Sequence, residues 1–166
     1  EYGGDYHQSM RVECRECEGT GFNKNLKKYK IKGKSIFDVW KMTLDEAIDF
    51  FEDIDKSITK VCITASEIML GHLQIGQATA TLSGGENIRI KIMKASKSTA
   101  KVIGVDEPFK GLSNIEIDAV ANYLNRIREK GKTLIVIDHS TGVEDYFSQW
   151  IQIENIDNRL IGKQFK

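Results

Sequence analysis

The stretch Thr81-Leu82-Ser83-Gly84-Gly85-Glu86 comes directly before an amphipathic run from Asn87 to Ala95. Ser83 is a favoured N-cap residue, so we expect a helix to begin here. Two glycines at its start would let another molecule approach the backbone closely, and the free N–H groups of a helix N-terminus attract phosphate. An ordinary serine-capped helix with a flexible lead-in would give the same pattern, so the segments that follow must decide between the two interpretations.

Two short apolar runs downstream, 102–105 and 133–137, predict fully buried strands. Between them the capping pattern Ser113-x-x-Glu116 opens a helical stretch that ends at Gly131. A strand, a helix and a second strand with short connections require a right-handed crossover. The sequence therefore predicts an α/β fold with a parallel sheet.

Chemically active side chains follow both predicted strands. Asp106 and Glu107 come after the first strand, and His139 comes shortly after the second. The carboxyl ends of neighbouring parallel strands meet at one edge of a sheet, where nucleotides bind. Asp106 is suited to hold Mg²⁺ and Glu107 to orient or deprotonate an attacking water. An acidic turn and a turn histidine remain the alternative interpretation.

The first half of the chain carries two further helical patterns. Thr43-x-x-Glu46 is a capping box, and a second helix is predicted from Ser57 to Leu70, ended by Gly71. Its apolar positions are expected to be buried: Ile58, Val61, Cys62, Ala65, Ile68 and Met69. Cys62 is thereby interpreted as a core residue.

Cys14 and Cys17, followed closely by glycines, have the spacing of a knuckle that wraps a tetrahedral metal. A structural zinc site needs four ligands, and only one such pair is present. His7 and Cys62 lack convincing spacing, so half of a zinc module is an equally good interpretation. The lysine-rich run 24–34 beside it fits either nucleic-acid phosphates or a plain solvated strand.

The 166 residues carry no net charge and are 40% hydrophobic, as expected for a folded domain of ordinary size with a small appendage. The sequence shows no run of membrane-spanning length and no signal peptide, and its three cysteines fit a reducing cytoplasm. It begins at Glu1 and not Met, which suggests a piece of something longer. Toward the end, Thr141-x-x-Glu144 predicts a short helix, Trp150–Ile153 a strand, and 155–166 an edge strand.

The order of these signals resembles the second half of an ABC-type ATPase. Residues 82–86 resemble the ABC signature, 102–107 the Walker B strand, 111–114 the D-loop, and His139 the switch histidine. Within that superfamily the chain resembles the UvrA family, in the order of that family's C-terminal half. The features shared with UvrA are the Cys-x-x-Cys-x-Gly knuckle, Gly33-Lys-Ser-Ile-x-x-Val39 with Met42-Thr43 and Glu46-Ala47, and Gly76-Gln77-x-x-x-Thr81.

The resemblance implies a partial P-loop NTPase sheet (99–166), a helical signature region (36–98) and a zinc-knuckle and basic segment (1–35). It implies ATP, Mg²⁺ and Zn²⁺ as cofactors, with the residue roles that follow. Ser83, Gly84 and Gly85 would contact the γ-phosphate of ATP held by an opposing P-loop, and Glu86 belongs to the same nucleotide-binding stretch. Asp106 would support Mg²⁺, Glu107 would activate water and His139 would sense the γ-phosphate. Cys14 and Cys17 would bind zinc.

The implied function is ATP-dependent recognition of DNA damage in nucleotide excision repair, in the cytoplasm and away from membranes. The implied partners are damaged duplex DNA, a UvrB-like protein and a second copy of the full-length protein.

The chain also departs from the family pattern. It has no Gly-x-x-x-x-Gly-Lys-Ser/Thr sequence, so we expect it to be inactive alone. Ile88 stands where Gln is usual, Phe109-Lys110 where two small hydroxyl residues are usual, and Asn114 and Asp138 also differ from the common choices. The alternatives are a drug-resistance relative of UvrA, an ABC protein of transport or translation, or a non-enzymatic zinc-knuckle binding module.

Overall fold

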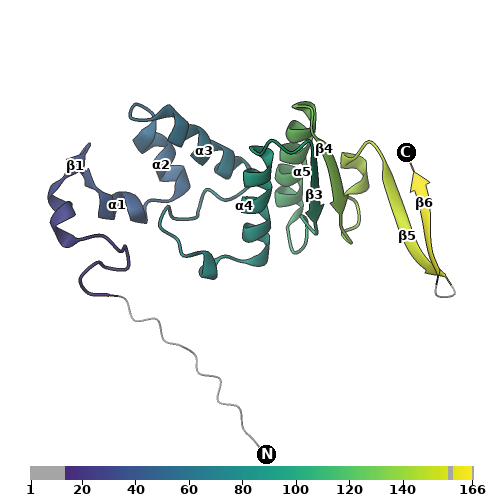
Figure 1. Ribbon diagram of the computed structural model, residues 1–166, viewed down its shortest axis with the longest axis horizontal. Coiled ribbons are helices and arrows are strands. Elements are labelled where there is room, and N and C mark those ends of the chain that lie inside the picture. The colour runs from purple at the N-terminus through teal and green to yellow at the C-terminus, as the bar shows by residue number, and fades with distance from the viewer. Residues whose placement is uncertain (1–13, 157–158, 166) are drawn as a thin grey trace, which may run out of the picture.

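The computed structural model describes residues 14–156 and 159–165, and of residues 155, 156 and 159 it describes the backbone alone. The chain forms an α/β structure whose elements follow one another along its long axis. A small hairpin lies near one end and a longer hairpin at the other (Figure 1). Across the described ranges, no helix is long and apolar enough to cross a lipid bilayer.

The basic segment forms short elements and not one continuous strand. A 3-10 helix, η1 (Lys24–Lys28), precedes strands β1 (Lys30–Ile31) and β2 (Lys34–Ser35), which pair antiparallel. The turn between the strands has φ of 46° at Lys32 and 76° at Gly33, the left-handed values that a tight hairpin turn requires. All lysines of the segment are exposed.

Helix α1 (Ile36–Lys41) is anchored by aromatic rings. Ser35 and Asp38 form a capping box at its start. The Phe22 ring meets Trp40 edge to face at 5.1 Å between centroids. The backbone carbonyl of Trp40 accepts the Gly76 N–H at 2.8 Å, and this bond ties α1 to the loop that contains Gly76.

Helices α2 (Leu44–Phe51) and α3 (Lys56–Glu67) pack on each other. The predicted capping box of α2 is confirmed: the Glu46 N–H donates to Thr43 Oγ1 at 3.1 Å, and the Thr43 N–H donates to Glu46 Oε2 at 2.9 Å. Asp55 caps α3 by accepting the N–H groups of Ser57 and Ile58.

The predicted end of α3 is wrong by three residues. The helix stops at Glu67, and Met69 adopts φ of 61°, so that the Leu70 N–H reaches the Ala65 carbonyl at 2.9 Å. This is the bonding of a left-handed helix end, with methionine in the place that glycine usually takes. The burial prediction is also partly wrong. Cys62, Ala65 and Ile68 are buried, but Ile58, Val61 and Met69 are 37–39% exposed.

Strands β3 (Val102–Asp106) and β4 (Thr133–Ile137) pair in parallel, with Val102 opposite Thr133 and Asp106 opposite Ile137. Helix α5 (Asn114–Glu129) crosses between them, as predicted. The prediction of fully buried strands is wrong. In β3 the side chains alternate between exposed and buried, because helices cover only one face of this two-stranded sheet.

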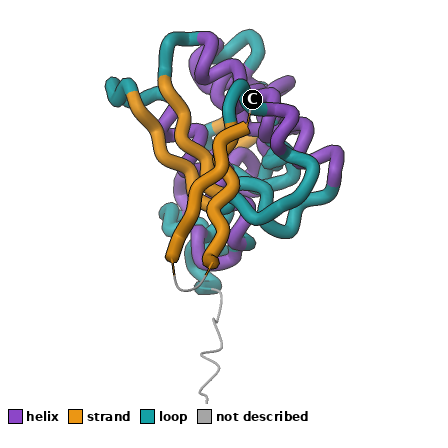
Figure 2. The backbone as a smooth tube through the Cα atoms, turned by 90° about the vertical axis from the view of Figure 1, so that its right-hand side faces the viewer, coloured by secondary structure: helices purple, strands orange, loops and turns teal. Residues whose placement is uncertain are grey.

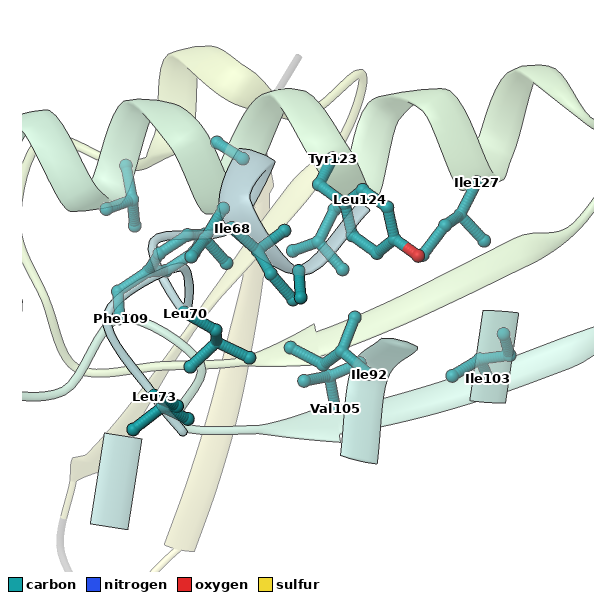
Figure 3. Packing of buried hydrophobic residues seen from close by; sticks show 14 residues of the cluster. Ile68, Leu70, Leu73, Ile92, Ile103, Val105, Phe109, Tyr123, Leu124 and Ile127 are labelled. Carbon is teal, nitrogen blue, oxygen red and sulfur yellow. The ribbon is translucent and has the colours of Figure 1, made fainter. Parts of the chain in front are cut away.

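The main hydrophobic core lies between α5 and the covered face of the sheet (Figure 3). Leu124 and Ile127 of α5 face Ile103 and Val105 of β3, and Ile92 of helix α4 (Gly84–Ser96) joins them. Ile68, Leu70 and Leu73 bring the end of α3 and its following loop into the same cluster. The helical region and the sheet therefore share one core.

After β4 the chain forms a 3-10 helix, η3 (Glu144–Tyr146), and a hairpin of β5 (Trp150–Ile156) and β6 (Arg159–Phe165). The predicted cap at Thr141 is wrong, since η3 starts after Val143. The two predicted strands exist, but they pair antiparallel with each other. Within the described residues they form a sheet separate from β3 and β4. Strands of both sheets are drawn in orange in Figure 2.

We expect Gly76→Ala to destabilise the fold by about 1–3 kcal/mol, the usual cost of overpacking. A Cβ on Gly76 would lie 2.1 Å from Trp40 Nε1, so the indole that anchors α1 would have to move. The free energy of unfolding from urea denaturation measures the effect.

The matched control is Gly104→Ala in β3, where nothing lies within 4 Å of an added Cβ. Its free energy of unfolding should change by less than about 0.5 kcal/mol. Equal losses from the two substitutions would contradict the role given to the Trp40 contact.

Candidate functional site

The Ser-Gly-Gly stretch forms the N-terminus of α4, as the sequence predicted. Ser83 is the N-cap; its Oγ accepts the Glu86 N–H at 3.2 Å, and its own N–H donates to Glu86 Oε2 at 2.6 Å. Ser83 and Gly84 are exposed, and no atom lies within 4 Å of a Cβ built on Gly84. The first N–H groups of a 13-residue helix therefore face open space, as an anion site requires.

His72 holds the acidic residue of this capping box. Its Nε2 lies 2.9 Å from Glu86 Oε1, and it stands in the loop that Leu70 and Leu73 fix in the core. The hydrogen bond from the Ser83 N–H, followed by that from His72, keeps the pKa of Glu86 below its ordinary value. Sequence reasoning missed His72, because the spacing to Glu86 matches no motif.

The start of α5 lies against the start of α4. Leu112 Cδ2 is 3.5 Å from the position of a Cβ on Gly85. Ser113 donates its N–H and its hydroxyl to Glu116, and these bonds lower the pKa of that carboxyl. The N-termini of two helices thus meet where Leu112 packs on Gly85.

Arg89 lies beneath this junction and is almost fully buried. Its Nη1 is 3.6 Å from Glu116 Oε1, and Nη1 and Nε find no hydrogen-bond partner in the described part of the chain. Sequence reasoning missed Arg89 as well. The available signal was a charged residue four positions after Gly85 and three before Ile92, on the stripe of α4 that faces the core.

The carboxylates predicted at the sheet edge are brought together. Asp106 ends β3 opposite Ile137, and the Glu107 N–H extends the ladder by donating to the Ile137 carbonyl at 2.7 Å. Glu107 has φ of 48°, an unusual conformation for a residue with a side chain. The register therefore sets Asp106 and Glu107 beside Asp138.

Asp138 ties the ends of the two strands together. It accepts the Phe109 N–H at 2.9 Å and the Ser140 N–H at 2.7 Å. Burial alone would raise the pKa of Asp138, but the hydrogen bonds from Ser140, Phe109 and His139 together outweigh it and lower that pKa. Phe109 itself is buried in the core, which explains how a large ring is accommodated after Pro108.

Lys110 bonds to the candidate base. Its Nζ lies 2.6 Å from Glu107 Oε2. This hydrogen bond raises the pKa of Lys110, and the charges of Glu107, Asp106 and Asp138 raise it further. The carboxylates at this edge are oxygen ligands of the kind that Mg²⁺ prefers, but no three of them in the described residues are placed to share one ion.

His139 follows Asp138 at the same edge, as predicted. Its ring is exposed, and no side-chain hydrogen bond joins it to another described residue.

Cys14 lies just before a turn that contains Cys17, and N–H groups of this turn point at the Cys14 sulfur. The hydrogen bonds from the N–H groups of Cys17 and Glu16, with a smaller contribution from the Cys17 thiol, lower the pKa of Cys14. Between residues 14 and 165, apart from the gap at 157–158, no three His, Cys, Asp or Glu side chains are placed to share a metal. Cys62 is buried in the core and His7 lies outside the described residues, so the described residues alone do not provide the four ligands of a structural zinc site.

Comparison with known proteins supports the resemblance seen in the sequence. UvrABC system protein A of Rickettsia bellii is 39% identical over 135 residues, which cover 80% of this chain and 14% of that protein. The same protein of Thermus thermophilus is 36% identical over 137 residues, covering 81% of this chain and 14% of that protein. The crystal structure of UvrA2 from Deinococcus radiodurans matches 91% of this chain with a TM-score of 0.78 and 31% identity, over 19% of that structure.

The chain is a UvrA-like sequence. It spans 14% of the length of these curated relatives. The archaeal ribosome recycling factor aABCE1 shares the fold, with a TM-score of 0.53 and 23% identity over 76% of this chain and 23% of its own. No family model matches. These relatives favour UvrA over the transport, translation and zinc-knuckle alternatives.

The two capping carboxylates of this UvrA-like chain predict an acid sensitivity. The pKa values of Glu86 and Glu116 lie below the ordinary value of 4.5. A depressed pKa adds stability that is present above the unfolded-state value and is lost as pH falls through the folded-state value. We therefore expect the free energy of unfolding to fall from about pH 5 toward pH 3.

Urea denaturation at a series of pH values measures this dependence. Glu86→Gln and Glu116→Gln should each make it shallower, because glutamine does not titrate. If the free energy of unfolding of either variant depends on pH as steeply as that of the parent protein, that glutamate does not cause the acid sensitivity.

Proposed function

We propose that this chain supplies the signature and Walker B portions of a UvrA-like ABC-type ATPase of nucleotide excision repair. The observation that supports this most strongly is the combination of two features in one core. The open, Ser83-capped N-terminus of α4 is one, and the carboxylate edge of β3 and β4 is the other. Both occur in a chain 36–39% identical to UvrABC system protein A.

The signature turn would bind the γ-phosphate of ATP carried by an opposing P-loop. Ser83 Oγ already accepts the Glu86 N–H, so its O–H remains free to donate to a phosphate oxygen. The N–H groups of Gly84 and Gly85 and the helix dipole would add to that attraction. Glu86 would act by holding the turn in shape.

The carboxylate edge would serve a different nucleotide, bound by the P-loop of its own half. Asp106 would help to hold Mg²⁺, which neutralises charge on the transferred phosphoryl group. Glu107 would accept a proton from the attacking water, and His139 would contact the γ-phosphate. Lys110 would have to release Glu107 before it accepts that proton, since its ammonium now bonds to Glu107 Oε2.

The N-terminal segment would contact DNA. Lys28, Lys30 and Lys34 are exposed and form no ion pair with any described residue, whereas Lys24, Lys27 and Lys32 each meet a carboxylate. Cys14 and Cys17 would provide one pair of a four-cysteine zinc module. The 1–35, 36–98 and 99–166 segments would then divide the work into DNA contact, signature and hydrolysis. The full-length protein would act in the cytoplasm as a homodimer with a UvrB-like partner.

We expect Glu107→Gln in the full-length protein to lower kcat for ATP hydrolysis by about 10²–10⁴, the usual contribution of a general base. ATP affinity should change by less than about threefold, because the amide keeps the shape of the side chain. Steady-state phosphate release and equilibrium ATP binding measure the two quantities.

The matched control is Glu129→Gln at the exposed end of α5, which should leave both quantities unchanged. Hydrolysis at the parent rate by the Glu107 variant would show that Glu107 is not the base.

Replacing Lys28, Lys30 and Lys34 together by alanine should weaken binding to duplex DNA of any sequence. If all three meet phosphates, the slope of log K against log salt should become shallower by about 2–3. Fluorescence anisotropy at several salt concentrations measures the slope.

Alanine at Lys60, Lys97 and Lys101 removes the same charge from other exposed positions and is the control. The same loss of slope in both triple variants would point to overall charge and would contradict a dedicated DNA-contact segment.

A further inference from the structure

Arg89 is a buried cation with too few partners. The residue is 4% exposed, and its closest carboxylate oxygen, Glu116 Oε1, lies 3.6 Å from Nη1, beyond a good hydrogen bond. Nη1 and Nε have no hydrogen-bond partner among the described residues. Removing a guanidinium from water without full pairing destabilises a fold, so packing alone does not account for an arginine at this position.

The guanidinium points at the turn that faces the nucleotide. Nη1 lies 3.7 Å from the position that a Cβ on Gly85 would occupy, directly behind the first N–H groups of α4. Because Arg89 is buried, solvent and salt screen its charge far less than that of a surface lysine. Its charge and the positive end of the helix dipole therefore act on the same point in front of Ser83 and Gly84.

Two carboxylates lie near this guanidinium, but neither accepts a hydrogen bond from Nη1 or Nε. Glu116 accepts the N–H and the hydroxyl of Ser113, and Glu86 accepts the Ser83 N–H and lies 2.9 Å from His72 Nε2. Each carboxylate is thus committed to a capping box or to His72. The two carboxylates therefore oppose the charge of Arg89 without satisfying the hydrogen bonds of Nη1 and Nε.

We propose that Arg89 is a positioning residue that makes the signature turn selective for a nucleoside triphosphate over a diphosphate. It acts through the N–H groups of Gly84 and Gly85 and does not touch the nucleotide. This inference rests on the proposed function, in which the turn meets only the γ-phosphate. A diphosphate lacks that group and gains nothing from the buried charge.

The test compares Arg89→Met with the parent full-length protein. Binding of ATPγS and of ADP, each with Mg²⁺, is measured by calorimetry, and Tm is measured without nucleotide. We expect ATPγS affinity to fall roughly tenfold, the effect of losing one charge-assisted interaction, while ADP affinity stays the same. The Tm without nucleotide should hold or rise, because an apolar side chain replaces an underpaired charge. Arg89→Lys should keep part of the preference.

Arg126→Met is the matched control, because Arg126 is paired with Glu67 at 2.9 and 3.0 Å, on the surface of α5. It should leave the ratio of ATPγS to ADP affinity unchanged. A parallel loss of both affinities with a lower Tm in Arg89→Met would show a structural role and overturn the inference. An unchanged ratio of ATPγS to ADP affinity in that variant would overturn it as well.

A parent protein that does not prefer ATPγS to ADP, and whose Glu107→Gln variant hydrolyses ATP normally, would overturn the proposed function as well.

Discussion

The parallel pairing of β3 with β4 is the constraint on which the rest of the structure depends. Two parallel strands cannot be joined by a tight turn, so α5 must cross over the sheet and return along its covered face. That crossing buries Leu124 and Ile127 against Ile103 and Val105. It also sets Asp106 opposite Ile137, which places the carboxylates that follow both strands at one edge.

The same crossing brings two helix N-termini together. Leu112, in the loop that leads into α5, lies against Gly85 at the start of α4, while Arg89 and Glu116 meet beneath. Anything that binds in front of Ser83 is therefore coupled by direct packing to the loop that follows the carboxylate edge.

Much of the local structure could be predicted. Thr43 and Ser83 each start a helix with a glutamate at the third position, and Gly131 follows the end of α5 with φ of 87°. Where prediction failed, a tertiary contact prevailed. Residues 68–70 leave the helical path because Ile68 and Leu70 are drawn into the core, and this holds Met69 in a left-handed conformation.

By itself the sequence determined where the helices after Thr43, Ser83 and Ser113 begin, that β3 and β4 are parallel, and which edge carries Asp106 and Glu107. These features depend on neighbours within a few residues or on the length of a connection. The tertiary structure alone decided that one face of β3 is exposed, that His72 bonds to Glu86, and that Arg89 lies buried beside Glu116. Those contacts depend on how separate elements pack. Burial and charge pairing are properties of that packing and not of the order of residues.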